Sequence, residues 1–218
     1  MKKVSHSNVL IPAEDVVLAA NLSVPENPKG IVIFSHGSGS SRHSPRNRFV
    51  AQILNDNGMA TLLADLLTTR EDMSYQTRFD IELLTRRLTA ITNWALTQPQ
   101  LQGLGVGYFG ASTGAASALQ TAALLKDKIQ AVVSRGGRPD LAKAALPLVK
   151  APALLIVGSL DEPVIELNEE AYDQLKCHKK LNILEGASHL FEEPGTLEEV
   201  ARLATDWFGK YLVPLEIP

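Results

Sequence analysis

Short apolar runs alternate with longer amphipathic segments along most of the chain, and this alternation restricts the fold more than any other feature. The runs lack polar alternation, as expected of strands that are buried on both faces. They are GIVIFSHG (30–37), MATLLAD (59–65), GVGYFGAS (105–112), QAVVSRGG (130–137), ALLIVGS (153–159) and LNILEG (181–186). Strands that alternate with helices predict an α/β protein with a mostly parallel sheet and helices on both faces.

Three amphipathic segments have helical spacing. Residues 46–57 and 78–97 each carry apolar side chains on one face, and each is followed by a helix-stopping residue. Near the end of the chain, Thr196 and Glu199 predict a capping box at the start of a helix that covers residues 196–211. Helices are therefore expected between the strands and after the last of them.

The N-terminal segment differs from this pattern. SNVLIPA (7–13) and VVLAANLSV (16–24) are separated by a short turn and predict an antiparallel pair at one edge of the sheet, for about eight strands in total. The least regular segment, LLTTREDMSYQT (66–77), reads as a polar loop after a strand. We expect it to lie over the strand ends, where open α/β sheets bind ligands.

Composition limits the class of protein and its partners. The 218 residues are 45% hydrophobic and 21% charged, which suits one globular domain over residues 1–218. A net charge of −3 supplies no electrostatic reason to expect nucleic acid or an anionic membrane. The single cysteine, Cys177, forms no internal disulfide, and neither a secretory segment nor a membrane-spanning run is visible. We therefore expect a cytoplasmic protein.

The stretch GYFGASTGAASA (107–118) matches two different motifs. One is the dinucleotide-binding pattern G-x-G-x-x-G, but its first two glycines would lie inside or before the strand, whereas the true motif follows the strand. The other is G-x-S-x-G, centred on Ser112 between a buried strand and an Ala-rich helix. That context is typical of a nucleophile elbow, a strained turn that presents a catalytic serine.

A serine nucleophile needs a base, and the base needs a carboxylate to orient it. In the elbow-containing fold the chain order is serine, acid, histidine. Asp161 follows one strand and His189 follows the last strand, so both lie at carboxyl ends in that order. Asp140 is the alternative acid, although its sequence context equally predicts a helix cap.

The loop HGSGSS (36–41) follows the first strand of the parallel set. An oxyanion hole in this arrangement uses the amide after the nucleophile, here Thr113, and one amide from this earlier loop, for which we predict Ser38. We expect His36 to shape the loop rather than to act as the base.

Five segments together resemble a known family: FSHGSGSSRHSPRN, GYFGASTGAA, VVSRGGRPDLA, LLIVGSLDEPV and GASHLFEEPG. In this order and spacing they are similar to the α/β-hydrolase superfamily, specifically to its dienelactone-hydrolase-like branch. The resemblance implies the α/β-hydrolase fold with Ser112, Asp161 and His189 as a triad. For a serine hydrolase of this kind we expect no cofactor and no metal. Dienelactone hydrolases proper carry cysteine at the nucleophile position, so the serine favours hydrolysis of a small carboxylic ester.

Two questions stay open at this point. Arg42, Arg135 and Arg138 follow strand ends and could bind an anionic part of the substrate, since arginine suits carboxylate and phosphate groups, or they could pair with acids and hold loops. The fold also allows an acyltransferase with the same triad, or a non-catalytic protein that binds a partner or ligand.

Overall fold

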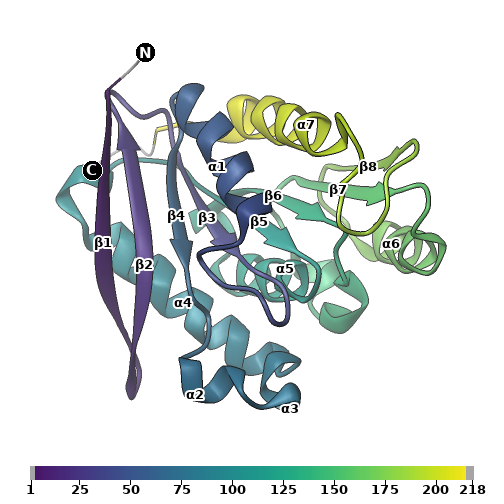
Figure 1. Ribbon diagram of the computed structural model, residues 1–218, viewed down its shortest axis with the longest axis horizontal. Coiled ribbons are helices and arrows are strands. Elements are labelled where there is room, and N and C mark those ends of the chain that lie inside the picture. Colours follow the sequence, from purple (N-terminus) through teal and green to yellow (C-terminus); the bar gives the residue numbers. More distant parts are fainter. Residues whose placement is uncertain (1–2, 215–218) are drawn as a thin grey trace.

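An eight-stranded sheet forms the middle layer of the computed structural model, which describes residues 3–214 (Figure 1). Its order is β1 (Val4–Ala13), β2 (Val16–Pro25), β4 (Ala60–Ala64), β3 (Ile31–Ser35), β5 (Val106–Ala111), β6 (Ile129–Arg135), β7 (Ala153–Gly158) and β8 (Lys179–Leu184). β2 is antiparallel to both β1 and β4, and the other pairs are parallel. The predicted fold class, including its antiparallel edge pair, is confirmed.

Helices cover both faces of the sheet (Figure 1). One face carries α1 (Pro45–Asp56) and α7 (Thr196–Tyr211), and the other carries α4 (Ile81–Thr97), α5 (Thr113–Leu125) and α6 (Glu162–Gln174). The remaining helical segments are α2 (Thr69–Asp72), α3 (Tyr75–Arg78) and four 3₁₀ turns at Pro99–Leu101, Lys126–Lys128, Pro139–Ala142 and Leu146–Leu148 of the described chain. Among the helices of residues 3–214, none is long and apolar enough to cross a membrane.

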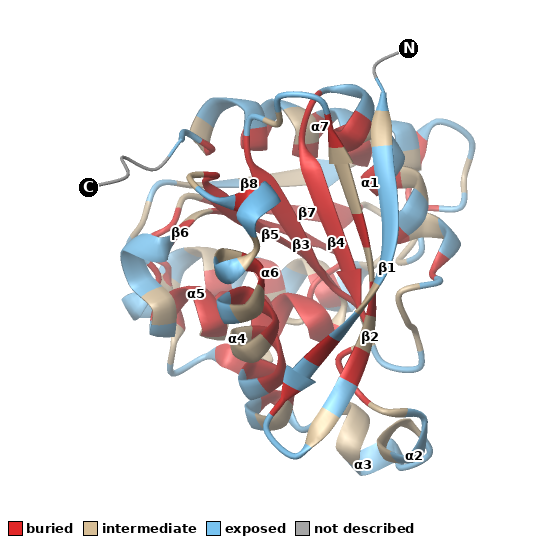
Figure 2. Cartoon of the chain, turned by 90° about the vertical axis from the view of Figure 1, so that its left-hand side faces the viewer, coloured by how far each residue is buried: buried red, intermediate tan, exposed pale blue. Residues whose placement is uncertain are grey.

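The sheet separates two hydrophobic cores, and the strand that precedes Ser112 contributes to both. Tyr108 packs into the core beneath α4 and α5, while Phe109 packs into the core beneath α1 and α7. Both side chains are fully buried. The central strands are buried along their length, whereas β1 is largely exposed (Figure 2). The lack of polar alternation in the runs that form β3 to β7 therefore reflects burial on two faces. The same expectation is wrong for β8, which lies at the edge of the sheet and has no fully buried residue.

The predicted capping box at Thr196 and Glu199 is wrong by one residue. Gly195, in the left-handed conformation at φ 83°, is the N-cap of α7, and Thr196 is already helical. The Thr196 hydroxyl donates to the Glu193 carbonyl at 2.7 Å instead of accepting a helix amide. Only a glycine adopts such a φ without strain, and this moves the start of the helix.

Residues 66–77 are more ordered than a polar loop. They hold α2 and most of α3, and a capping box at Thr68 and Glu71 begins α2. Glu71 also pairs at 2.9 Å with Arg87, a nearly buried residue of α4. This segment lies beside the loop after β3, because the Leu66 amide donates to His36 Nε2 at 3.0 Å.

Candidate active site

Ser112 lies at the turn between β5 and α5, with φ 50° and ψ −123°. A non-glycine residue in this region costs on the order of 1–3 kcal/mol, so its surroundings must hold it there. A Cβ on Gly110 would lie 2.5 Å from the Ala115 Cα, and a Cβ on Gly114 would lie 2.1 Å from the Ser35 carbonyl oxygen. Glycine at both positions therefore lets α5 approach the sheet closely enough to form the strained turn.

Asp161 and His189 come together after β7 and β8. The His189 Nδ1 lies 2.6 Å from Asp161 Oδ2. An ionised carboxylate only accepts, so Nδ1 carries the hydrogen and Nε2 is left as the acceptor. Although Asp161 is the N-cap residue of α6, its side chain caps no helix amide. Its carboxylate is therefore available to orient the imidazole.

The alternative acid, Asp140, is already engaged. Its two carboxylate oxygens each accept from the Arg138 guanidinium, both at 2.8 Å. This bidentate pair raises the pKa of Arg138, chiefly through the side-chain hydrogen bond. The geometry thus favours Asp161 over Asp140 as the partner of His189.

A cavity of about 270 Å³ lies in front of Ser112, and His189 also lines it. It lies at the carboxyl ends of the parallel strands, where β3 has β4 on one side and β5 on the other. This change of direction is the usual ligand site of open α/β sheets. Within residues 3–214, no hydrogen bond joins the Ser112 hydroxyl to His189, and no group of three or more metal-ligating side chains could hold a metal ion.

The two predicted oxyanion donors differ in their present bonding. Thr113 is the first residue of α5, and an amide at that position has no acceptor within its own helix. The Ser38 amide donates to the Thr113 hydroxyl at 2.9 Å, so it is not free to meet an oxyanion in this structure. Gly37 packs directly against the nucleophile, since a Cβ there would lie 3.1 Å from the Ser112 Cβ.

The three predicted arginines separate into two groups. Arg42 bonds the Asp65 carboxylate through its amide at 2.7 Å and through its guanidinium, and Arg138 pairs with Asp140. Both hold loops. Arg135 lines the Ser112 cavity and is only 6% exposed. Burial, and then the nearby Arg46, lower its pKa to about 10.

His36 is buried under the loop after β3. Its Nε2 accepts a hydrogen bond from the Leu66 amide at 3.0 Å, and its Nδ1 lies 3.0 Å from the Gly37 carbonyl. Burial lowers its pKa. The imidazole therefore ties the end of β3 to the segment after β4, as a loop-shaping residue would.

Sequence reasoning missed Asn47, which lines the cavity from the first turn of α1. Its signal was weak, because a polar residue at the start of a helix is ordinary. Arg46, beside it in the same turn, also lines the cavity, and its place in the sequence directly after the oxyanion loop is the feature that points to the site.

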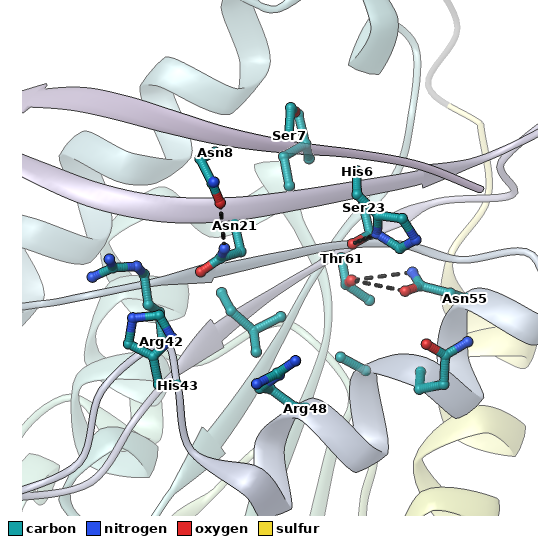
Figure 3. Close-up of a pocket in the computed structure, with 14 residues that line it drawn as sticks. His6, Ser7, Asn8, Asn21, Ser23, Arg42, His43, Arg48, Asn55 and Thr61 are labelled. Atoms are coloured by element: carbon teal, nitrogen blue, oxygen red, sulfur yellow. Dashed lines mark hydrogen bonds between the residues drawn. The ribbon is translucent and has the colours of Figure 1, made fainter.

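A hollow larger than the Ser112 cavity lies elsewhere (Figure 3). This groove, of about 620 Å³, separates α1 from β1, β2 and β4, and we call it the β1–α1 groove. Its polar side chains bond one another: His6 Nδ1 lies 2.8 Å from Ser23 Oγ, and the Asn21 side chain donates to Asn8 at 2.7 Å. Of the predicted site residues, Arg42 alone is among its lining residues.

Comparison with known proteins shows the family and supports the fold. Residues 18–212 match the model of the dienelactone hydrolase family. The solved structure of a dienelactone hydrolase from Anabaena variabilis is 55% identical, covers 96% of this chain and 99% of its own, and superposes with a TM-score of 0.93. Est1E from Butyrivibrio proteoclasticus shares the fold at 18% identity, with a TM-score of 0.80 over 93% of this chain and 98% of its own.

A curated relative from Mycobacterium tuberculosis strain H37Rv has a different name. It is 56% identical over 204 residues, which are 94% of this chain, and its name proposes a phosphoribosyl transferase. Those residues are 46% of the relative, so this chain spans about half the length of the curated proteins it matches.

Proposed function

The chain belongs to the dienelactone hydrolase family, and from this premise we propose that it is a serine hydrolase that cleaves a small carboxylic ester through an acyl-enzyme on Ser112. The observation that carries the proposal is the arrangement of the site. A serine in a strained turn and a histidine bonded to a carboxylate open onto the same cavity of about 270 Å³. The size of the cavity favours a small substrate, because sites for drug-sized ligands are typically about 300–1,000 Å³.

In the first half of the proposed reaction, His189 Nε2 takes the proton of Ser112 as Oγ attacks the ester carbonyl carbon. The tetrahedral intermediate then expels the alcohol, which receives the proton from His189, and Ser112 is left acylated. Water attacks this acyl-enzyme with His189 again as the base, and the acid and the free serine are released. In free enzymes the catalytic hydrogen bonds are often long and tighten only when substrate binds. We expect the hydrogen bond between Ser112 and His189 to form in this way.

The oxyanion would accept hydrogen bonds from the amides of Thr113 and Ser38. For Ser38 this requires exchange, since its amide now donates to the Thr113 hydroxyl. Thr113→Val tests the exchange by removing the competing acceptor. We expect kcat to stay the same or to rise, because the Ser38 amide is then free to bond the oxyanion, and each such amide donor is worth about 10²–10³ in rate. A fall in kcat of that size would overturn the role of Ser38.

Water can reach the base of the proposed reaction, because the His189 side chain is 37% exposed. The transferase named for the mycobacterial relative belongs to a protein about twice as long. For this chain we propose acyl transfer to water.

Labelling with a fluorophosphonate tests the proposal directly. The probe should modify Ser112, located by mass spectrometry, and a panel of 4-nitrophenyl esters of rising chain length should favour short acyl groups. A folded protein that is neither labelled nor active on any of these esters would contradict the proposal and favour a non-catalytic binding protein.

A further inference from the structure

The β1–α1 groove is lined by polar side chains on a face of the sheet that a helix partly covers. His6 and Ser23 are opposite partners in the ladder between β1 and β2, and so are Asn8 and Asn21. Positions two residues apart on a strand point to the same face, so these four side chains form one polar surface toward α1 (Figure 3). A sheet usually buries an apolar face against the helix that covers it. Here the face is polar, and the space of about 620 Å³ stays open.

The groove is richer in positive than in negative groups. Arg42, His43 and Arg48 line it where α1 begins, and none of the described residues that line it is acidic. The Arg42 guanidinium is bonded to Asp65. Within residues 3–214, neither the Arg48 guanidinium nor the His43 imidazole has a hydrogen-bonded or ionic partner. A hollow with spare N–H donors and no carboxylate favours an anion.

A buried acceptor defines a second requirement. The Asn21 side chain donates to Asn8 Oδ1 at 2.7 Å, but its own Oδ1 is buried and has no partner in the part of the chain that the structure describes. An amide oxygen only accepts, so an O–H or N–H group satisfies it and an anion does not. In Figure 3 this amide lies between Arg42 and the bonded pair of His6 and Ser23. A ligand that meets both requirements combines an anionic group with a hydroxyl.

The dimensions of the groove limit the class of ligand further. Arg48 and Asn55 both line it, and their spacing on α1 corresponds to about 10 Å at about 1.5 Å per residue. The volume lies within the usual range for organic ligands, about 300–1,000 Å³. No phenyl, phenol or indole ring is among the described lining residues, so a nucleobase would have no such ring to stack on. A phosphate monoester carries a charge of about −1.5 to −2 and three acceptor oxygens, which suits the basic end of the groove.

We propose that the β1–α1 groove binds a phosphate monoester of a sugar or polyol, with the phosphate at Arg48 and His43 and a hydroxyl on Asn21 Oδ1. The groove and the Ser112 cavity have no lining residue in common. The proposal therefore does not rest on the hydrolase function. Ser112→Ala should bind the ligand as tightly as the unmodified protein does.

Three matched probes test the ligand class by calorimetry. Sorbitol 6-phosphate carries both groups, hexyl phosphate carries the phosphate on the same carbon chain without hydroxyls, and sorbitol carries the hydroxyls alone. We expect sorbitol 6-phosphate to bind about 3- to 10-fold more tightly than hexyl phosphate, the size of a hydroxyl hydrogen bond. Sorbitol alone should give no signal. Equal affinity for hexyl phosphate or inorganic phosphate would contradict the polyol assignment, and no binding of sorbitol 6-phosphate would overturn the site.

Two arginines in the first turn of α1 supply matched variants, because Arg48 lines the groove and Arg46 lines the Ser112 cavity. Arg48→Met should weaken the binding of sorbitol 6-phosphate by about 10-fold, the size of a charge-assisted hydrogen bond, and Arg48→Lys should keep part of the affinity. Arg46→Met removes the same charge and should leave Kd unchanged. The reverse result would place the anion at the Ser112 cavity. Equal losses would show only an effect of net charge, and either outcome would overturn the proposal.

Asn21→Leu tests the hydroxyl contact separately. It should remove the preference for sorbitol 6-phosphate over hexyl phosphate while hexyl phosphate still binds, and urea unfolding checks that the variant is folded. A preference that survives in folded Asn21→Leu would overturn the role of Asn21.

Vesicles distinguish a free phosphate ester from a lipid headgroup of the same chemistry. Phosphatidylcholine vesicles with and without phosphatidylinositol 4-phosphate are sedimented with the protein. Co-sedimentation that needs this lipid and that Arg48→Met abolishes would support a headgroup as the source, and its absence beside binding of sorbitol 6-phosphate would support a free phosphate ester. Co-sedimentation without any binding of sorbitol 6-phosphate would overturn the groove as a polyol phosphate site.

Discussion

The Ser112 cavity and the β1–α1 groove are both lined by polar side chains, but they use them in opposite ways. The groove has more than twice the volume, about 620 Å³ against about 270 Å³. In the groove, His6 bonds Ser23, and Asn21 bonds Asn8, so one unpaired buried atom remains there, Asn21 Oδ1. Among the residues that line the cavity, three buried atoms are unpaired: Arg46 Nε, Asn47 Oδ1 and Arg135 Nε. The proposed catalytic site is therefore the smaller of the two hollows, and more of its buried polar atoms lack a partner.

Backbone strain is present at the cavity and also elsewhere in the described chain. Ser112 holds a positive φ at the cavity, the paired residues of β1 and β2 form a regular antiparallel ladder, and Glu14 in the turn between these strands also has a positive φ. Strain of this kind persists only where the surroundings enforce it, and it gathers at functional sites.

Serine to alanine should have the largest effect. Ser112→Ala removes the nucleophile and is expected to lower kcat by about 10⁴–10⁶-fold. Ser23→Ala, in the groove, removes only the bond to His6, and its kcat should stay within about twofold of the unmodified enzyme, since a surface substitution of this kind is usually mild. Steady-state hydrolysis of a 4-nitrophenyl ester measures both. Equal losses in the two variants would break the distinction between cavity and groove.

Asp161→Asn should cause the second-largest fall in kcat. The amide preserves the shape but permits the wrong imidazole tautomer, so we expect kcat to fall by about 10⁴-fold. Asp140→Asn is its control, because that carboxylate bonds Arg138 rather than His189. The same ester assay applies to both variants. If Asp140→Asn were the more damaging change, the acid of the triad would have to be reassigned.

The tight packing at the elbow predicts a loss of stability. In Gly114→Ala the new methyl group would lie 2.1 Å from the Ser35 carbonyl oxygen, and overpacking of this kind costs about 1–3 kcal/mol in the free energy of unfolding. Gly209→Ala, in α7, has no atom within 4 Å and should instead stabilise by about 0.5–1 kcal/mol. Urea unfolding measures both, and a neutral Gly114→Ala would show that α5 can move away from the sheet.

The sequence was sufficient for the fold because burial on both faces leaves a visible pattern. The six apolar runs correspond to β3 through β8, and the two N-terminal segments became β1 and β2. Asp161 and His189 were also within reach, since the carboxyl ends of parallel strands share one edge of the sheet. Their predicted proximity appears as a 2.6 Å contact.

What the sequence could not supply depends on contacts between distant segments. Arg135 lies unpaired because the loops around it bring no acid, and nothing local in VVSRGG records that. The bond from Ser38 to the Thr113 hydroxyl joins residues 75 positions apart. The start of α7 depends on the φ of Gly195, so a side-chain pattern at Thr196 and Glu199 could not fix it.

The smallest effect should come from two histidines, His36 near the cavity and His6 in the groove. In the folded protein, burial lowers the pKa of His36 below its usual 6.5, although Asp65 and Asp72 act in the opposite direction. A protonated ring would also turn an N–H toward the Leu66 amide, where Nε2 now accepts. The native state therefore keeps this imidazole neutral.

The direction of the pH effect follows from this difference. Below about pH 6.5 the unfolded chain binds a proton at His36 that the folded chain does not, so stability falls as the pH decreases toward the lowered pKa, by at most about 1.4 kcal/mol per pH unit. His36→Gln should remove this part of the slope, whereas His6→Gln, at an exposed ring, should leave it in place. Urea unfolding at pH 7.5, 6.5 and 5.5 compares the three proteins. Parallel curves for the unmodified protein and His36→Gln would mean that the buried imidazole opens to water before the fold is lost, and the loop beside the cavity would then be less firmly held than its bonds indicate.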